Sequence, residues 1–167
     1  MKERESNVLS LLEDKTNIYA RKIALGMKTQ FGWKELTYDG LGLMSRRLAA
    51  YLMNDLGIQR GGKLAILSES KPEYGACVFA SVISGLITVP LDIKLTKYEL
   101  QSILSDCLPS VMLVSQSYID KALELQKAIP SLKHIIVMDE HPVNENLQSI
   151  YTCLLYTSPS PRDGLLS

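Results

Sequence analysis

The sequence predicts an α/β fold in which a parallel sheet is flanked by helices. Between residues 63 and 138, four short apolar segments of strand length alternate with helical segments. Such alternation calls for parallel strands joined by right-handed crossovers, with the helices covering the faces of the sheet. Hydrophobic residues make up 46% of the 167 residues and charged residues 22%, which provides enough apolar material for a packed core.

Before this repeat, the sequence predicts a short helix, a hairpin and a longer helix. Polar Asn7 followed by apolar residues indicates a capped helix that ends near Glu13. The β-prone segments 23–25 and 31–36 lie on either side of a polar stretch and indicate a hairpin. Thr37 can cap the next helix, and Gly57 suits its end. The apolar positions of this helix step by three or four residues: Leu41, Met44, Leu48, Leu52 and Leu56.

The repeat itself contains four expected strands and three expected helices. Pro72 is suited to the first turn of the first helix, which is apolar on nearly all sides and stops at Gly85. Thr96 and Glu99 form a capping box at the start of the second helix. The third helix is expected over residues 116–127. The strands are expected at residues 63–68, 87–91, 111–114 and 135–138.

Composition excludes several classes of protein. Eighteen Lys and Arg residues balance eighteen Asp and Glu residues, so no nucleic-acid partner is expected. The longest mostly apolar stretch, residues 74–87, is shorter than the roughly 20 residues that cross a bilayer. The first residues lack the apolar segment of a signal peptide. The three cysteines are far apart and have no metal-ligand spacing, so we expect a reducing, cytoplasmic location and no structural zinc.

Two glycine-rich segments resemble nucleotide-binding motifs but have the wrong context. Residues 57–63 nearly fit the P-loop pattern, yet Leu64 follows where a P-loop has Ser or Thr, and the expected order is helix, loop, strand. Residues 40–45 resemble the start of a dinucleotide fingerprint, but they lack its third glycine and lie within an expected helix. We interpret the first segment as a turn that leads into a strand and the second as part of a helix.

Polar residues that follow the expected strands are the candidates for ligand binding. Residues 68–70 (Ser-Glu-Ser) follow the first strand of the repeat and Asp92 follows the second. Open α/β sheets bind ligands at the carboxyl ends of their strands. The alternative for both groups is helix capping and turn chemistry. His134, which opens a strand, and His141, in a polar loop, are expected to be solvated or singly hydrogen-bonded.

Several segments, in this order and with these gaps, resemble the AMP-forming acyl-CoA synthetases. Ser70-Lys71-Pro72-Glu73-Tyr74 resembles the family's "NSPEW" segment, and residues 85–96 resemble its "GAVVVPLNPRLT" segment. The resemblance covers about residues 7 to 140. The other matching segments are residues 36–41, 45–52, 56–67, 99–106 and 111–115.

The resemblance implies that residues 1–152 are the first part of the large N-terminal domain of an adenylate-forming enzyme. Such enzymes make an acyl-adenylate from ATP and a carboxylic acid, then transfer the acyl group to a thiol, usually that of coenzyme A. The family's Ser/Thr/Gly-rich phosphate loop, its Tyr-Gly-x-Thr-Glu segment, its ribose-binding Asp and its C-terminal-domain Lys do not occur here. We therefore assign no catalytic, cofactor-binding or metal-binding residue. ATP, Mg²⁺ and coenzyme A are expected for the intact parent and no cofactor for this chain alone, which we expect to be inactive.

Within the family, residues 88–96 are most similar to fatty-acyl members, which implies a long- or medium-chain fatty acid–CoA ligase. Its partners would be a carboxylic acid, ATP, coenzyme A and the missing C-terminal remainder of the chain. Peripheral contact with a membrane surface is a further expectation. The alternatives are an aryl- or amino-acid-adenylating enzyme of the same family, or a small non-enzymatic α/β binding module.

The end of the sequence has a different character from the rest. Residues 153–167 are rich in Ser, Pro and turn formers and have no periodic apolar pattern. Residues 153–163 can be encoded by an oligonucleotide that resembles the transposase adapter used in sequencing libraries. We therefore expect residues 153–167 to be an artefactual tail, with the natural reading frame interrupted near Thr152.

Overall fold

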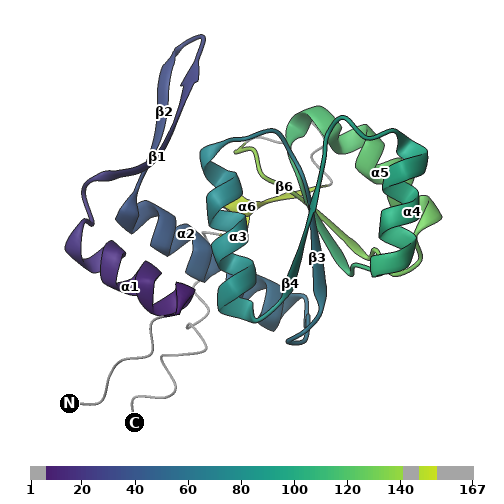
Figure 1. Cartoon of the computed structure of the whole chain (residues 1–167), viewed down its shortest axis with the longest axis horizontal. Helices are drawn as coiled ribbons and strands as arrows, with labels where there is room; N and C mark the ends of the chain where they lie inside the picture. Colours follow the sequence, from purple (N-terminus) through teal and green to yellow (C-terminus); the bar gives the residue numbers. More distant parts are fainter. Residues whose placement is uncertain (1–6, 141–146, 154–167) are drawn as a thin grey trace.

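A computed structural model describes residues 7–140 and 147–153, which form a parallel sheet between helices and a separate hairpin (Figure 1). The strands are β1 (Ile23–Thr29), β2 (Gly32–Thr37), β3 (Lys63–Leu67), β4 (Ile87–Leu91), β5 (Val111–Val114), β6 (His134–Val137) and β7 (Gln148–Ser149). The helices are α1 (Val8–Ile18), α2 (Tyr38–Ala50), α3 (Pro72–Ser84), α4 (Lys97–Cys107), α5 (Ile119–Ala128) and α6 (Ile150–Cys153). A π-helical turn, η1 (Tyr51–Asp55), extends α2, and a 3-10 turn, η2 (Gln116–Tyr118), precedes α5.

The predicted parallel sheet is confirmed. Its strand order is β4-β3-β5-β6-β7, and each neighbouring pair is parallel. Leu64 of β3 lies opposite both Thr88 of β4 and Val111 of β5. Residues 64–67 of β3 are fully buried. They form an unbroken apolar segment, which is typical of strands that are covered on both faces.

Side chains of β3 point alternately into two cores. Leu64 and Ile66 pack with α2 and α3 on one face, whereas Ala65 and Leu67 pack with α4 and α5 on the other. Figure 1 shows α1, α2 and α3 on one side of the sheet and α4 and α5 on the other. This three-layer arrangement leaves the carboxyl edge of the sheet open to the loops.

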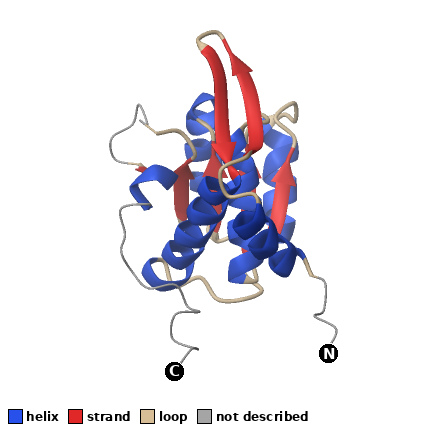
Figure 2. Cartoon of the chain, turned by 90° about the vertical axis from the view of Figure 1, so that its left-hand side faces the viewer, coloured by secondary structure: helices blue, strands red, loops and turns tan. Residues whose placement is uncertain are grey.

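The hairpin of β1 and β2 extends away from this body (Figures 1 and 2). Strand β1 is longer than the predicted segment 23–25, and β2 is shifted by one residue from the predicted segment 31–36. The two strands pair antiparallel, with Thr29 opposite Gly32 at the turn. Gly32 has a φ of 122°, a conformation that favours glycine.

Helix α1 runs past Glu13, where we expected it to end, and continues to Ile18. Its N-cap is Asn7, as predicted, and the side chains of Asn7 and Ser10 bond reciprocally to each other's backbone N–H groups. The extra turns bury Thr16 against α2, where a Cβ on Gly42 would lie 2.7 Å from the Thr16 Cγ2 atom. Gly42 therefore serves close helix packing, in agreement with our interpretation of residues 40–45.

The glycine-rich segment 57–63 is the turn that we expected. Gly57, with a φ of 64°, follows Leu56, the C-cap of the helical segment, and Gly61 has a φ of 81°. The Gly62 N–H donates to the Gln59 carbonyl oxygen at 2.9 Å and the chain then enters β3. The segment precedes a strand rather than a helix, so it lacks the geometry of a P-loop.

The capping box of α4 is present and supports a quantitative prediction. The Glu99 N–H donates to Thr96 Oγ1 at 3.3 Å, and the Thr96 N–H donates to Glu99 Oε2 at 2.8 Å. The Thr96 hydroxyl also donates to Glu99 Oε2 at 2.7 Å, and this bond together with the one from the Thr96 N–H lowers the pKa of Glu99. We expect Thr96→Ala to lower the free energy of unfolding by about 1 kcal/mol, measured by urea denaturation. Thr96→Ser keeps the hydroxyl and should remain near the wild-type value, and equal midpoints for both variants would contradict the capping role.

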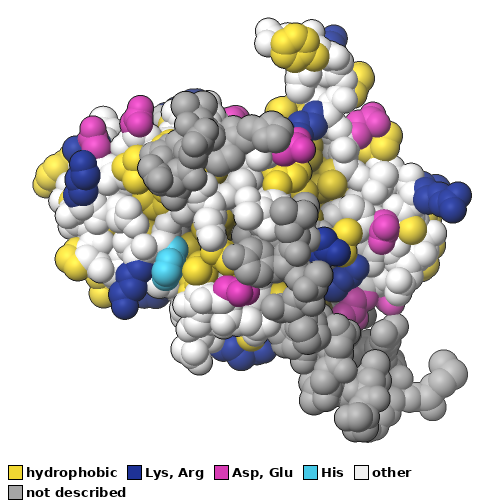
Figure 3. Space-filling model, turned by 180° about the vertical axis from the view of Figure 1, so that it is seen from behind, with side chains coloured by type: hydrophobic (Ala, Val, Ile, Leu, Met, Phe, Trp, Pro, Cys, Tyr) yellow, Lys and Arg dark blue, Asp and Glu magenta, His cyan; other side chains and the backbone are white. Residues whose placement is uncertain are grey.

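Charged side chains are mixed on the surface. On the face shown in Figure 3, Lys and Arg side chains are interspersed with Asp and Glu side chains and do not gather into a basic stripe. Among residues 7–140 and 147–153, no helix has the length and apolar character needed to cross a membrane.

Candidate functional site

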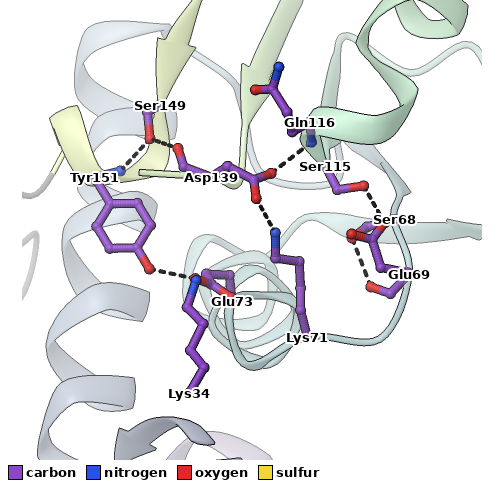
Figure 4. A network of polar contacts seen from close by, with 10 residues as sticks. All are labelled: Lys34, Ser68, Glu69, Lys71, Glu73, Ser115, Gln116, Asp139, Ser149 and Tyr151. Carbon is purple, nitrogen blue, oxygen red and sulfur yellow. Dashed lines mark hydrogen bonds and ion pairs between the residues drawn. The ribbon is translucent and has the colours of Figure 1, made fainter. Parts of the chain in front are cut away.

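A connected set of polar side chains lies at the carboxyl edge of the sheet (Figure 4). Its members come from the ends of β3, β5, β6 and β7, the start of α3, the hairpin and α6. We call this set the carboxyl-edge network; it consists of Lys34, Ser68, Glu69, Lys71, Glu73, Ser115, Gln116, Asp139, Ser149 and Tyr151. Parallel topology explains the grouping, since every strand of such a sheet ends at the same edge.

Two of the residues predicted from the sequence belong to this network. The Ser115 hydroxyl, after β5, donates to the Glu69 carboxylate, and the Ser68 hydroxyl donates to the Glu69 backbone carbonyl at 2.8 Å. Ser115 is fully buried and Ser68 is 8% exposed. Glu69 therefore links the ends of the neighbouring strands β3 and β5. Ser70 is exposed and lies beside the network rather than within it.

Asp139 is the centre of a second group, which sequence reasoning missed. Its carboxylate forms an ion pair with Lys71, and its other carboxylate oxygen accepts a hydrogen bond from the Gln116 N–H at 2.7 Å. The Ser149 hydroxyl donates to the Asp139 backbone carbonyl. The Lys71 side chain is only 5% exposed. Asp139 comes just after the fourth strand of the repeat, so the rule that selected residues 68–70 would also have found it.

Glu73 forms the third group and is almost completely buried, with 1% of its surface exposed. One carboxylate oxygen pairs with Lys34 of β2 and accepts a hydrogen bond from the Tyr151 hydroxyl of α6. The other oxygen, Oε2, has no hydrogen-bond partner within the described part of the chain. Burial raises the pKa of Tyr151, as do the hydrogen bond and the negative charge of Glu73. The first turn of α3 thus holds both the hairpin and the last described helix.

Asp92 lies outside the network, although it follows β4 in the expected way. Its carboxylate accepts the Lys94 N–H at 2.9 Å, and its backbone carbonyl accepts the Leu95 N–H. These bonds close the turn that precedes α4 and leave Asp92 exposed. The turn-chemistry alternative is the one that the structure supports for this residue.

His134 is not part of the carboxyl-edge network. His134 opens β6 at the opposite, amino edge, where it is half-buried. Burial and the neighbouring Lys133 lower the pKa of its imidazole. His141 lies outside the described residues.

A hollow of about 420 Å³ lies next to the network, between the hairpin and the start of α3. Leu25, Gly26 and Met27 form one wall, and residues 70–72 with Tyr74 and Gly75 form the other. The lining is mostly apolar. The Lys71 side chain, although it reaches this hollow, is engaged by Asp139.

The network is arranged to hold elements together rather than to react. Each of its three carboxylates is bound by a hydroxyl or an ammonium group of a different element: Glu69 by Ser115, Glu73 by Lys34 and Tyr151, and Asp139 by Lys71. Among residues 7–140 and 147–153, no group of three or more His, Cys, Asp or Glu side chains is placed to hold a metal ion.

Comparison with known protein families gives a match over most of the chain. The profile of a family described as "AMP-binding enzyme" matches residues 12–161. The long-chain-fatty-acid–CoA ligase ACSBG1 of Homo sapiens is 30% identical over 135 residues, which is 80% of this chain and 18% of the relative. The hybrid PKS-NRPS synthetase pydA of an Acremonium species is 32% identical over 105 residues, 63% of this chain and 2% of the relative.

Solved structures give a concordant fold. The crystal structure of the anthranilate CoA ligase AuaEII with anthranoyl-AMP superimposes with a TM-score of 0.75 at 24% identity, over 89% of this chain and 27% of that one. The chain thus spans about a fifth of the human relative and about a quarter of this structure. The parallel sheet with flanking helices is the arrangement that these proteins share with it.

Proposed function

The chain belongs to the AMP-binding enzyme family, and from this premise we propose that its intact parent is an ATP-dependent, AMP-forming long- or medium-chain fatty acid–CoA ligase. We further propose that residues 1–152 are part of the parent's large N-terminal domain and that residues 153–167 are an artefactual tail. The parent would act in the cytoplasm or at a membrane surface.

The observation that carries this proposal is the likeness to long-chain-fatty-acid–CoA ligases over four fifths of the chain. The segments between residue 36 and residue 115 also support it, because they are scaffold segments that the family shares in the same order along the chain. The likeness to a PKS-NRPS synthetase favours a second candidate, an enzyme that activates an amino or aryl acid and passes it to a carrier protein.

The proposed reaction has two steps. A carboxylate oxygen of the acid attacks the α-phosphorus of ATP, which forms the acyl-adenylate and expels pyrophosphate. The thiol sulfur of coenzyme A then attacks the acyl carbon, which forms the thioester and expels AMP. Both steps build up negative charge that cationic groups must stabilise.

The described residues do not fit the magnesium ion that ATP would bring. The carboxylates Glu69, Glu73 and Asp139 are already bound to other elements of the chain. The described residues therefore take no part in a step through the ion. Their contribution would be structural, since the carboxyl-edge network fixes the hairpin, α3 and α6 with respect to the sheet.

The test begins with the complete reading frame, recovered from the source DNA. We expect an open frame that continues past Thr152 without the codons for residues 153–163. The purified product, given ATP, magnesium, coenzyme A and a panel of acids, should form AMP and a thioester together with fatty acids. AMP release with amino or aryl acids alone would support the second candidate, and the absence of adenylation with every acid would refute the ligase.

A further inference from the structure

The hairpin of β1 and β2 meets the body of the chain at its base. Its far end extends away from the helices, and Phe31 at the turn is 92% exposed (Figures 1 and 2). At the base, Leu25 packs against α3, where a Cβ on Gly75 would overlap the Leu25 side chain. Because a two-stranded hairpin is only marginally stable by itself, the contacts at its base determine how firmly it is held.

Lys34 of β2 adds a polar attachment to the same helix. Its ammonium group pairs with Oε1 of the buried Glu73, in the first turn of α3. The Tyr151 hydroxyl of α6 donates a hydrogen bond to the same oxygen (Figure 4). The Lys34 Nζ atom also lies 6.0 Å from the centroid of the Tyr151 ring. Three elements that are far apart in the sequence therefore meet at one carboxylate oxygen.

Helix α6 depends on its neighbours in a similar way. It has four residues, which are too few for a helix to be stable by itself. Ile150 is fully buried in the core that α2 and α3 share, and Tyr151 provides the polar contact with Glu73. The hairpin and α6 thus each have an apolar anchor of their own and one contact with the same carboxylate.

Sharing one oxygen makes the two polar contacts depend on each other. Within the described part of the chain, Glu73 Oε2 has no hydrogen-bond partner, so Lys34 and Tyr151 hold the carboxylate through Oε1. A buried carboxylate that loses one of its partners is less well oriented for the other, because its side chain can then turn. Groups that belong to one such network do not contribute additively.

We propose that Glu73 couples the docking of the hairpin to the docking of α6, so that loosening one element loosens the other. The hairpin residues 25–27 form one wall of the hollow of about 420 Å³ beside α3, and the position of the hairpin therefore sets the width of this hollow. The hairpin is in this sense a strap whose closure depends on the chain that follows β7. The coupling involves described residues alone and does not depend on the proposed ligase activity.

Hydrogen–deuterium exchange of the purified chain, followed by mass spectrometry, tests the coupling. Tyr151→Phe removes one hydroxyl from α6, and we expect it to speed amide exchange in the hairpin, residues 23–37, by roughly threefold or more. Lys34→Met changes only the hairpin, and we expect it to speed exchange in residues 147–153. The double variant Lys34→Met/Tyr151→Phe should exchange in the hairpin little faster than the faster single variant, because both substitutions disrupt the same contact.

Two control variants are matched to these substitutions. Lys28→Met removes an exposed lysine from β1 and should leave exchange in residues 147–153 unchanged. Tyr118→Phe removes a hydroxyl on the other side of the sheet and should leave the hairpin unchanged. Effects confined to the substituted element, or a double variant whose acceleration equals the product of the single ones, would show independent contacts and overturn the proposal. Equal acceleration in α4 and α5 would also overturn it, because it would indicate a general loss of stability.

Discussion

Replacing Lys71 by methionine is expected to lower the free energy of unfolding by about 2–3 kcal/mol. The Lys71 side chain is 5% exposed and pairs with Asp139 at the carboxyl edge of the sheet. Methionine keeps the apolar stem of lysine but removes the ammonium group, so Asp139 loses its counter-ion in a site that water reaches poorly. The cost falls below the full value for a buried pair because Asp139 is 27% exposed and keeps its hydrogen bond from the Gln116 N–H.

Lys97→Met provides the matched control. Lys97 forms an ion pair with Glu124 in which the two side chains are 52% and 53% exposed. Because solvent screens such a pair, we expect its loss to leave the free energy of unfolding nearly unchanged. Urea denaturation followed by far-UV circular dichroism measures both variants. If the two substitutions lowered the free energy of unfolding by the same amount, burial would not explain the contribution of the Lys71–Asp139 pair to stability.

Among the strands, the four apolar strands of the parallel sheet could be predicted from the sequence. Each of the four is a short apolar segment between turn residues, and the structure places them at β3, β4, β5 and β6 within one residue of the expected bounds. Helix α3 could be predicted because Pro72 and Gly85 mark its ends, and Gly85 indeed has a φ of 65°. Local backbone chemistry determined these elements, so a single sequence was sufficient.

Elements that depend on tertiary contacts could not be predicted in the same way. The last turns of α1 contain polar Thr16, which is buried only because Gly42 lets α2 approach closely. Strand β7 consists of Gln148 and Ser149, which are not typical strand residues and are ordered by pairing with β6. The π-helical turn at Tyr51–Asp55 has no signal that distinguishes it from the apolar periodicity of an ordinary helix.

The candidate site shows the same division. The position of Glu69 could be predicted from its place after a buried strand, and Asp139 follows the same rule. Lys34 and Tyr151 could not be predicted, because they are far from Glu73 in the sequence and reach it only in the folded chain. In the sequence, an acidic residue in the first turn of a helix, such as Glu73, indicates a favourable contact with the helix dipole. Its burial depends on the hairpin and α6, which cover it only in the folded chain.

The purified 167-residue chain is expected to form no acyl-adenylate above the level of a protein-free control when it is given ATP, magnesium and a fatty acid. The phosphate-binding motifs that the family uses do not occur in its sequence, and the carboxylates of the carboxyl-edge network are bound to Lys34, Lys71, Tyr151 and Ser115. Because Lys34 and Lys71 of the network are paired with its carboxylates, they are not free to stabilise the negative charge that develops at the α-phosphate during adenylation.

Pyrophosphate release and thioester formation are the two readouts, and a complete acyl-CoA ligase serves as the positive control. A thermal melt of the same preparation must show a folded chain, because inactivity of an unfolded sample would carry no information. Lys71→Met serves as a second sample in this assay. The substitution removes the counter-ion of Asp139 without adding a cation, so this variant should be as inactive as the wild type. Turnover by the wild-type chain would mean that the described residues include an adenylation site, and Lys71, the most buried cation of the network, would then be the first residue to test for contact with the phosphates.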